Sequence, residues 1–230
     1  MPMLDTSYRE ARLRVVTVAA GLDGNQLRAP VPATPGWSVH HLLAHLVGGA
    51  ADAASGRLDG AGGRRWTARH VAERENDSVE ALLAEWQRVA PVVEAGLAGQ
   101  QFTGPNLAAD LICHEADLNE ALNLPPVDRG YWQEPFLNVM MWLLVQRLRP
   151  LTSILIRDEH GSEWCCATDT PALTLHADGY ELFRAMFSRR SRRQIAAWNW
   201  TPTPAQEVID SFGFFGPRDD DQPLPCKPKK

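Results

Sequence analysis

Cysteine is scarce in this sequence, and no cysteine is spaced for a metal or redox site. The four cysteines are Cys113, Cys165, Cys166 and Cys226. No two of them have the CxxC spacing of a redox motif, and together they lack the paired spacing of a zinc ribbon. Cysteines without such spacing are typical of proteins in a reducing compartment. We therefore expect a cytoplasmic protein.

Long apolar runs and an excess of basic residues are also absent. The most apolar stretch, residues 136–145, is about half as long as a helix that spans a bilayer. The first residues are mixed and polar, without the basic start, apolar middle and cleavage site of a secretory signal. The net charge of −5 and the pI near 5.8 argue against a nucleic-acid-binding surface. We expect neither a membrane nor a nucleic-acid partner.

The sequence does contain enough apolar material for two modest domains. It has 230 residues, of which 44% are hydrophobic. Helical periodicity dominates up to Pro150, and β-rich segments follow it. We therefore predict an α+β protein, with a helical bundle over residues 1–150 and a small α/β domain over residues 151–230.

Apolar spacing and capping residues predict five helices in the bundle. Ser7 and Glu10 have capping-box spacing, and Ser38 is a good N-cap for the second helix. Pro91 lies inside the third helix and should kink it. The fifth helix is apolar on nearly every side, which predicts burial on more than one face. The predicted ranges are 7–22, a helix that follows Ser38, one that begins at Asp77, about Pro105 to Leu122, and 135–148.

The remainder of the chain alternates between short strands and helices. Strands are indicated by β-rich or alternating segments, and helices by a return to apolar spacing of three and four. The predicted strands are 151–156, 163–167 and 173–176, and the predicted helices are 179–187 and 192–198.

One face of the fourth helix combines apolar and ionisable side chains. His114 lies in the middle of its apolar stripe, with Asp110 four residues before it and Asp117 three residues after it. Because buried polar groups need partners, these side chains should meet one another or a ligand. A carboxylate and an imidazole four residues apart project side by side, and can chelate a metal together with a ligand from another helix.

Simpler arrangements of the same residues are open. Asp110 and His114 can bond each other without a metal, and so can His114 and Asp117. Asp117 can also accept a hydrogen bond from a metal-bound His114 and fix its orientation. On the second helix, His41 faces away from the apolar stripe, whereas His40 and His45 flank it on opposite sides. The pattern leaves His40 and His45 equally open as the further ligand.

Three segments together carry a resemblance to a known family. They are TPGWSVHHLLAHLVGG, which contains Trp37 and His45, then ADLICHEADLNEALNLPP, and finally GYELFRAMFSRRSRRQIAAWNW. In this order they resemble the mycothiol-dependent maleylpyruvate isomerase family of actinobacteria. That family belongs to the DinB-like metal-binding four-helix bundles, and its small C-terminal α/β domain is compared with sterol-carrier folds.

The resemblance implies a ligand set and a cosubstrate. The family's first motif ends in a histidine ligand, which corresponds to His45. Its Glu-x3-His pair corresponds to Asp110 and His114, with aspartate in place of glutamate. Aspartate is one methylene shorter, which implies a looser site or closer helices. Two imidazoles and one carboxylate leave an open position of the kind found in catalytic zinc sites, although nickel or iron also suit such ligands.

The implied activity is that of a metal-dependent isomerase or S-transferase. The divalent metal, most simply zinc, would activate the thiol of mycothiol for attack on a small electrophilic, anionic substrate. The alternative, motivated by the aspartate, is a module of the same fold that binds a metal or ligand without turnover. A monomer and a homodimer are both open.

Further candidates lie outside the ligand set. The basic cluster of Arg189, Arg190, Arg192 and Arg193 can hold an anionic group, or it can be the solvated start of a helix. We take Arg190 and Asp117 as the catalytic candidates. Trp37 and Arg193 are the candidates for cofactor binding, although a tryptophan beside an N-cap can also serve packing alone.

Overall fold

The computed structural model describes residues 3–100 and 106–225. The described residues form two compact units, one that comprises residues 3–100, 106–127 and 224–225 and the other residues 128–223. The first unit is helical and the second contains a small mixed sheet, so the α+β class predicted from the sequence is confirmed.

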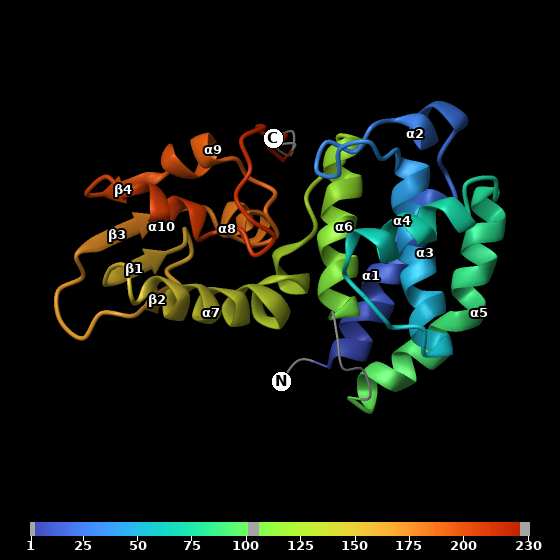
Figure 1. The fold of residues 1–230 in the computed structure, drawn as a ribbon, viewed down its shortest axis with the longest axis horizontal. Helices are drawn as coiled ribbons and strands as arrows, with labels where there is room; N and C mark the ends of the chain where they lie inside the picture. The colour runs from blue at the N-terminus through green and yellow to red at the C-terminus, as the bar shows by residue number, and fades with distance from the viewer. Residues whose placement is uncertain (1–2, 101–105, 226–230) are drawn as a thin grey trace. The chain divides into compact units, whose positions relative to one another are not determined.

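In the described part of the first unit, four long helices make up the bundle (Figure 1). Helix α1 contacts α5 and α6, and α3 contacts the same two helices, which closes a ring of four around one core. Apolar side chains fill this core, among them Leu42, Leu82, Trp86, Leu111 and Leu118. The shorter helix α4 packs on α3. Helix α2 comes before α3 in the sequence and also contacts it. The bounds are α1 Leu4–Ala19, α2 Gly24–Arg28, α3 Val39–Ser55, α4 Arg64–Glu73, α5 Val79–Ala98 and α6 Leu107–Ala121.

Capping residues explain where helices α3 and α6 begin. Ser38 Oγ accepts a hydrogen bond from the His41 amide, while His41 Nδ1 accepts one from the Ser38 amide, both at 3.3 Å. This reciprocal pair confirms Ser38 as the N-cap of α3. Asn106 caps α6 by accepting from the amides of Ala108 and Ala109. The predicted start of α6 at Pro105 lies outside the described residues.

Several helices of the first unit differ from the prediction, and the short helix α2 was not predicted. Helix α1 begins at Leu4, before the predicted capping box at Ser7, because its buried face extends through Asp5 and Tyr8. Helix α5 is capped by Ser78 and continues through Pro91 to Ala98. Helix α4 was not predicted, since it buries only Trp66 and His70 and its apolar pattern is weak.

The second unit is built on a four-stranded sheet with the order β2-β1-β3-β4. The strands are β1 Ile154–Arg157, β2 Glu163–Cys165, β3 Leu173–His176 and β4 Asn199–Thr201. Strands β1 and β3 are parallel, with Ile154 opposite Leu173, and the other pairs are antiparallel. The helical elements are η1 Arg129–Tyr131, η2 Gln133–Leu137, α7 Asn138–Leu148, α8 Gly179–Met186, α9 Arg192–Ala196 and α10 Gln206–Asp210. Strand β4 and helix α10 were not predicted.

The units meet in sequence at residue 127, not at the predicted residue 150. Aromatic packing accounts for the difference, because Trp132 lies 5.4 Å from Phe183 and 5.9 Å from Tyr180 between ring centroids. Helix α7 also contacts β2. This helix buries Met141 and Leu144 but exposes 59% of Trp142, so it is buried on one face and not on several.

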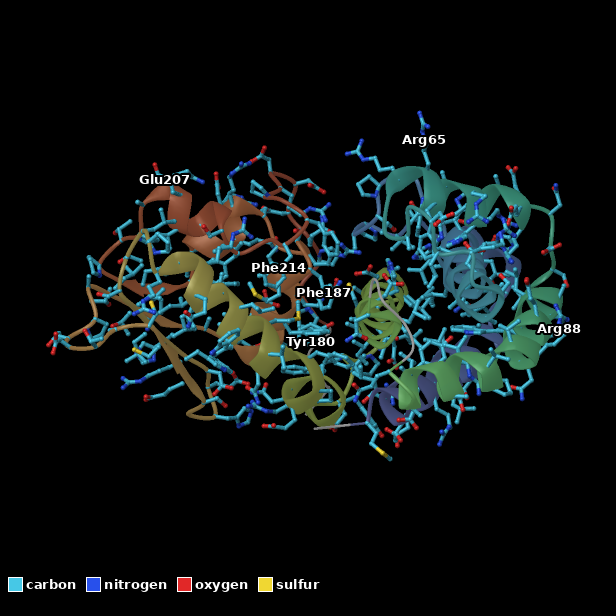
Figure 2. All side chains as sticks on the ribbon, turned by 60° about the horizontal axis from the view of Figure 1, so that its bottom comes forward. Arg65, Arg88, Tyr180, Phe187, Glu207 and Phe214 are labelled. Carbon is cyan, nitrogen blue, oxygen red and sulfur yellow. The ribbon has the colours of Figure 1, made fainter. Side chains whose placement is uncertain are left out.

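Surface and interior differ as expected for a folded domain. In Figure 2 the side chains of Arg65 and Arg88 project away from the helices that carry them, and both are exposed. Tyr180 and Phe187 are buried in the second unit. Among the helices in residues 3–100 and 106–225, none combines the length and the apolarity needed to cross a bilayer.

Candidate metal centre

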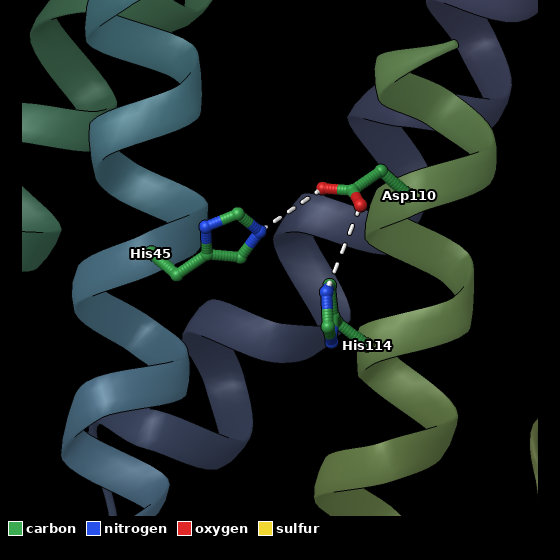
Figure 3. A group of neighbouring side chains, drawn as sticks. All are labelled: His45, Asp110 and His114. Atoms are coloured by element: carbon green, nitrogen blue, oxygen red, sulfur yellow. Dashed lines mark ion pairs between the residues drawn. The ribbon is translucent and has the colours of Figure 1, made fainter. Parts of the chain in front are cut away.

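Three ionisable side chains converge between α3 and α6. His45 extends from α3, and Asp110 and His114 extend from successive turns of α6, as Figure 3 shows. His45 Nε2 lies 3.5 Å from Asp110 Oδ2, and His114 Nε2 lies 3.6 Å from Asp110 Oδ1. One ligand atom from each residue falls within 4.8 Å of the other two. The structure thus brings together the three residues that the family resemblance implied as ligands.

This arrangement fits a divalent metal. In a tetrahedral zinc site each ligand atom is ~2.0–2.1 Å from the metal, which places the ligand atoms ~3.3 Å apart. The distances from Asp110 to the two imidazoles are close to that value, so aspartate is long enough to bridge them. The His45 and His114 side chains are 3% and 8% exposed, whereas that of Asp110 is 37% exposed. The cluster therefore opens on the side of the carboxylate.

A contact within α6 orients the His114 ring, and a contact with α1 anchors the helix beside it. His114 Nδ1 lies 2.9 Å from Oδ2 of the fully buried Asp117. The neighbouring Glu115 accepts two hydrogen bonds from Arg14 of α1, at 2.6 and 2.8 Å. Burial raises the pKa of the Glu115 carboxyl, and the contact with Arg14 opposes that rise. His114 therefore presents Nε2 to the cluster while Nδ1 is engaged.

A second buried network lies behind His45. His45 Nδ1 is 3.3 Å from Nδ1 of His70, and His70 Nε2 is 2.8 Å from Oδ2 of Asp52. Burial lowers the pKa of His70 despite its hydrogen bond to Asp52. Burial alone would raise the pKa of Asp52, but hydrogen bonds from Arg69 and His70 bring it below its ordinary value. His70 and Asp52 were not predicted from the sequence. The spacing of four between Trp66 and His70 could have indicated a helix face that buries His70.

Two tryptophans flank the histidines. The half-buried Trp37 ring lies 5.1 Å from the His45 ring and 6.2 Å from the His114 ring, between centroids. The buried Trp66 ring lies 6.1 Å from that of His45. Trp37 is thus beside both imidazoles, as a residue lining a ligand pocket would be, and its role in binding remains a prediction.

The structure separates the two histidines that the pattern left equivalent. His45 faces α6, whereas Nε2 of His40 lies 2.8 Å from the backbone carbonyl oxygen of Asp77. His40 therefore contacts the start of α5, away from Asp110 and His114.

Comparison with known proteins agrees with this geometry. The family model described as the mycothiol maleylpyruvate isomerase N-terminal domain matches residues 8–133, more than half of the chain. The chain belongs to this family. The matched range contains His45, Asp110 and His114, so all three ligand candidates of this maleylpyruvate isomerase relative lie inside the shared domain.

Two solved structures resemble the fold of this family member. One is a mycothiol-dependent maleylpyruvate isomerase, with 13% identity and a TM-score of 0.55, and the other is a histidine-to-alanine mutant of an enzyme of that name, with 11% identity and a TM-score of 0.53. Each match covers 89% of this chain and 95% of the solved chain. At this identity the likeness concerns the fold. No curated protein matches the sequence.

The predicted arginines lie beyond the matched domain, in the second unit of this family member. Arg190 is 1% exposed and donates to both carboxylate oxygens of Glu181, at 2.6 and 2.7 Å. Arg193 is largely exposed and forms an ion pair with Asp221. Arg192 pairs with Asp210 and Asp219. These ion pairs give the cluster a structural role, and its part in substrate binding stays a prediction.

Proposed function

We propose that this protein is a metal-dependent isomerase or S-transferase that uses mycothiol as the thiol cosubstrate and acts on a small, anionic electrophile in the reducing cytoplasm. The observation that carries the proposal is the convergence of His45, Asp110 and His114 within 4.8 Å, inside the domain that the family model matches. Two nitrogen ligands and one carboxylate are the donor set of catalytic zinc sites, in which a further position stays open.

The metal and the protein have separate tasks in this proposal. A bound divalent ion lowers the pKa of a thiol and so supplies a thiolate at neutral pH. The protein buries the two imidazoles, which excludes water from their side of the cluster. The partly exposed Asp110 leaves an open side for the thiol and the substrate, and Trp37 provides an apolar wall there.

The expected reaction consumes no thiol when the product is an isomer. Sulfur adds to one carbon of the substrate's carbon–carbon double bond, and the π electrons move into the adjacent carbonyl group. Rotation about the new single bond and loss of the same sulfur restore the double bond in the other geometry. When the adduct is instead protonated and released, the outcome is conjugation, in which one thiol is consumed for each substrate.

Metal analysis tests the first step. We expect about one zinc or other divalent ion per chain in protein purified without a histidine tag, and a large loss of metal in His45→Ala and His114→Ala. His40→Ala is the matched control. It removes another histidine of α3, and that histidine contacts the backbone carbonyl oxygen of Asp77 instead of the cluster. Metal content far below one per chain in the wild type, unchanged in the variants, would contradict the proposal.

Turnover tests the second step and separates the enzyme from a binding module. We expect maleylpyruvate to isomerise only when mycothiol is present, and the rate to fall after metal removal and recover when zinc is restored. Protein that holds its metal but shows no thiol-dependent conversion would instead support the non-catalytic module with aspartate at position 110.

A further inference from the structure

The network behind His45 joins three residues that are far apart in the sequence. Asp52 follows His45 by seven residues on α3, which is two helical turns and therefore out of direct reach. His70 of α4 lies between them and is fully buried. Its two ring nitrogens are engaged at opposite ends, Nε2 with Asp52 at 2.8 Å and Nδ1 with His45 at 3.3 Å.

Donor and acceptor requirements set the positions of the hydrogen atoms between Asp52, His70 and His45. Asp52 is ionised, because Arg57 and Arg69 pair with it, and a carboxylate can only accept. The proton between Asp52 and His70 therefore lies on His70 Nε2. In a neutral imidazole the other nitrogen is then an acceptor, so His70 Nδ1 must accept from His45. His45 consequently carries its proton on Nδ1, and its Nε2 lone pair is directed toward Asp110.

We propose that Asp52 and His70 form a positioning relay that fixes the tautomer of His45 and so presents its Nε2 as a metal ligand. The proposal rests on the proposed metal site. His114 receives the equivalent support directly, since Asp117 accepts from its Nδ1 at 2.9 Å. The two histidine ligands are thus oriented by carboxylates on opposite sides of the cluster, one in direct contact and the other through an intervening imidazole.

The backbone of α3 is shaped to accommodate the relay. A Cβ atom at Gly48 would lie 2.5 Å from both Cβ and Cγ of His70, closer than such atoms can approach. Glycine at this position therefore lets the His70 ring reach both of its partners. Arg69, next to His70 on α4, also forms an ion pair with Asp52 and holds the carboxylate in place beside His70.

The tautomer can be measured without a metal. Nitrogen-15 spectra of histidine-labelled, metal-free wild-type protein at neutral pH distinguish protonated from unprotonated ring nitrogens, and His45→Gln identifies the His45 signals. We expect His45 to be protonated at Nδ1 and unprotonated at Nε2. In Asp52→Asn the amide can donate as well as accept, so His70 can adopt either tautomer and the His45 signals should shift toward a mixture. Protonation of His45 at Nε2 in the wild type overturns the proposal.

Zinc affinity supplies the second readout, measured by competition with a chromophoric chelator. We expect Asp52→Asn to weaken zinc binding about 10–100-fold although all three ligands are intact. Glu73→Gln is the matched control, because Glu73 pairs with the same Arg57 and Arg69 but not with His70. An Asp52→Asn affinity equal to that of Glu73→Gln overturns the relay. If the wild type binds no zinc, the proposed function fails while the tautomer measurement still decides the relay.

Discussion

Trp86 and Tyr8 form a buried hydrogen bond in the bundle core. Trp86 Nε1 donates to the Tyr8 hydroxyl at 2.9 Å, and neither side chain is more than 3% exposed. Burial, opposed in part by the Trp86 contact, raises the pKa of Tyr8 from 10.0 to about 12. The folded state therefore favours the neutral Tyr8 hydroxyl. The contribution of this hydroxyl to the free energy of unfolding is complete below about pH 10 and is lost as the pH rises to about 12.

This shift predicts a specific alkaline sensitivity. We expect the wild-type free energy of unfolding to fall by about 2–3 kcal/mol more than that of Tyr8→Phe between pH 10 and pH 12. At neutral pH the variant should be less stable by about 1–3 kcal/mol, because Trp86 Nε1 loses its acceptor. Urea unfolding at neutral pH and at several values between pH 10 and pH 12 measures both effects. Parallel pH profiles for the two proteins would show that Tyr8 is not the group responsible.

The positions of Asp110 and His114 on α6 could be predicted from the sequence, whereas their partner on α3 could not. The spacing of four between Asp110 and His114 is sufficient to place both side chains on one helix face. The same spacing cannot say what stands opposite that face. Only the packed helices show that His45 meets Asp110 at 3.5 Å while His40 contacts a backbone carbonyl at the start of α5.

Helix α3 offers a direct test of the packing around His70. Gly48 and Gly49 are neighbours in this helix, and alanine at either position improves helix propensity by about 1 kcal/mol. We expect Gly48→Ala nevertheless to lower the free energy of unfolding by about 1–3 kcal/mol, because its Cβ would overlap His70. The Cβ of Gly49→Ala would lie 3.5 Å from the nearest atom, on Trp66, and should be neutral or stabilising.

Urea unfolding of both glycine variants gives the answer. Equal stability of the two variants would show that the Gly48 contact does not constrain His70. Loss of zinc affinity in Gly48→Ala but not in Gly49→Ala would link the same contact to the metal site through His70 and His45.

A helix start can be predicted from the sequence when its capping contacts are local. Ser38 was identified as an N-cap because its capping box is local, involving only Ser38 and His41. Helix α4 escaped prediction because just two of its side chains, Trp66 and His70, are buried. Both side chains face α3. Two buried positions are too few to form a recognisable apolar pattern, so the helix becomes evident only from its packing on α3.

Metal binding should increase the free energy of unfolding of the folded chain. All three ligand candidates belong to the first unit and join α3 to α6. Zinc in excess by about a hundredfold over its dissociation constant should add about 2.7 kcal/mol to the stability of the folded state. For a chain of this length that corresponds to a rise of about 5–10 °C in Tm.

Differential scanning calorimetry with zinc and with a chelator measures this shift. The control is His114→Ala, whose Tm should not respond to zinc, whereas His40→Ala should respond like the wild type. If the two units unfold separately, the transition of the first unit alone should move. An equal shift in His114→Ala would locate zinc binding elsewhere in the chain.

The class of the fold, the principal helices and strands, and the placing of Asp110 and His114 on one helix face follow from the amino-acid sequence alone. These features depend on local periodicity and capping, which act over a few residues. Only the packed helices show that His45 of α3 faces α6 and that His70 and Asp52 lie behind it. The boundary between the units at residue 127 likewise comes from the packing. Those outcomes depend on contacts between segments distant in the chain, where geometry comes from packing and not from spacing along one helix.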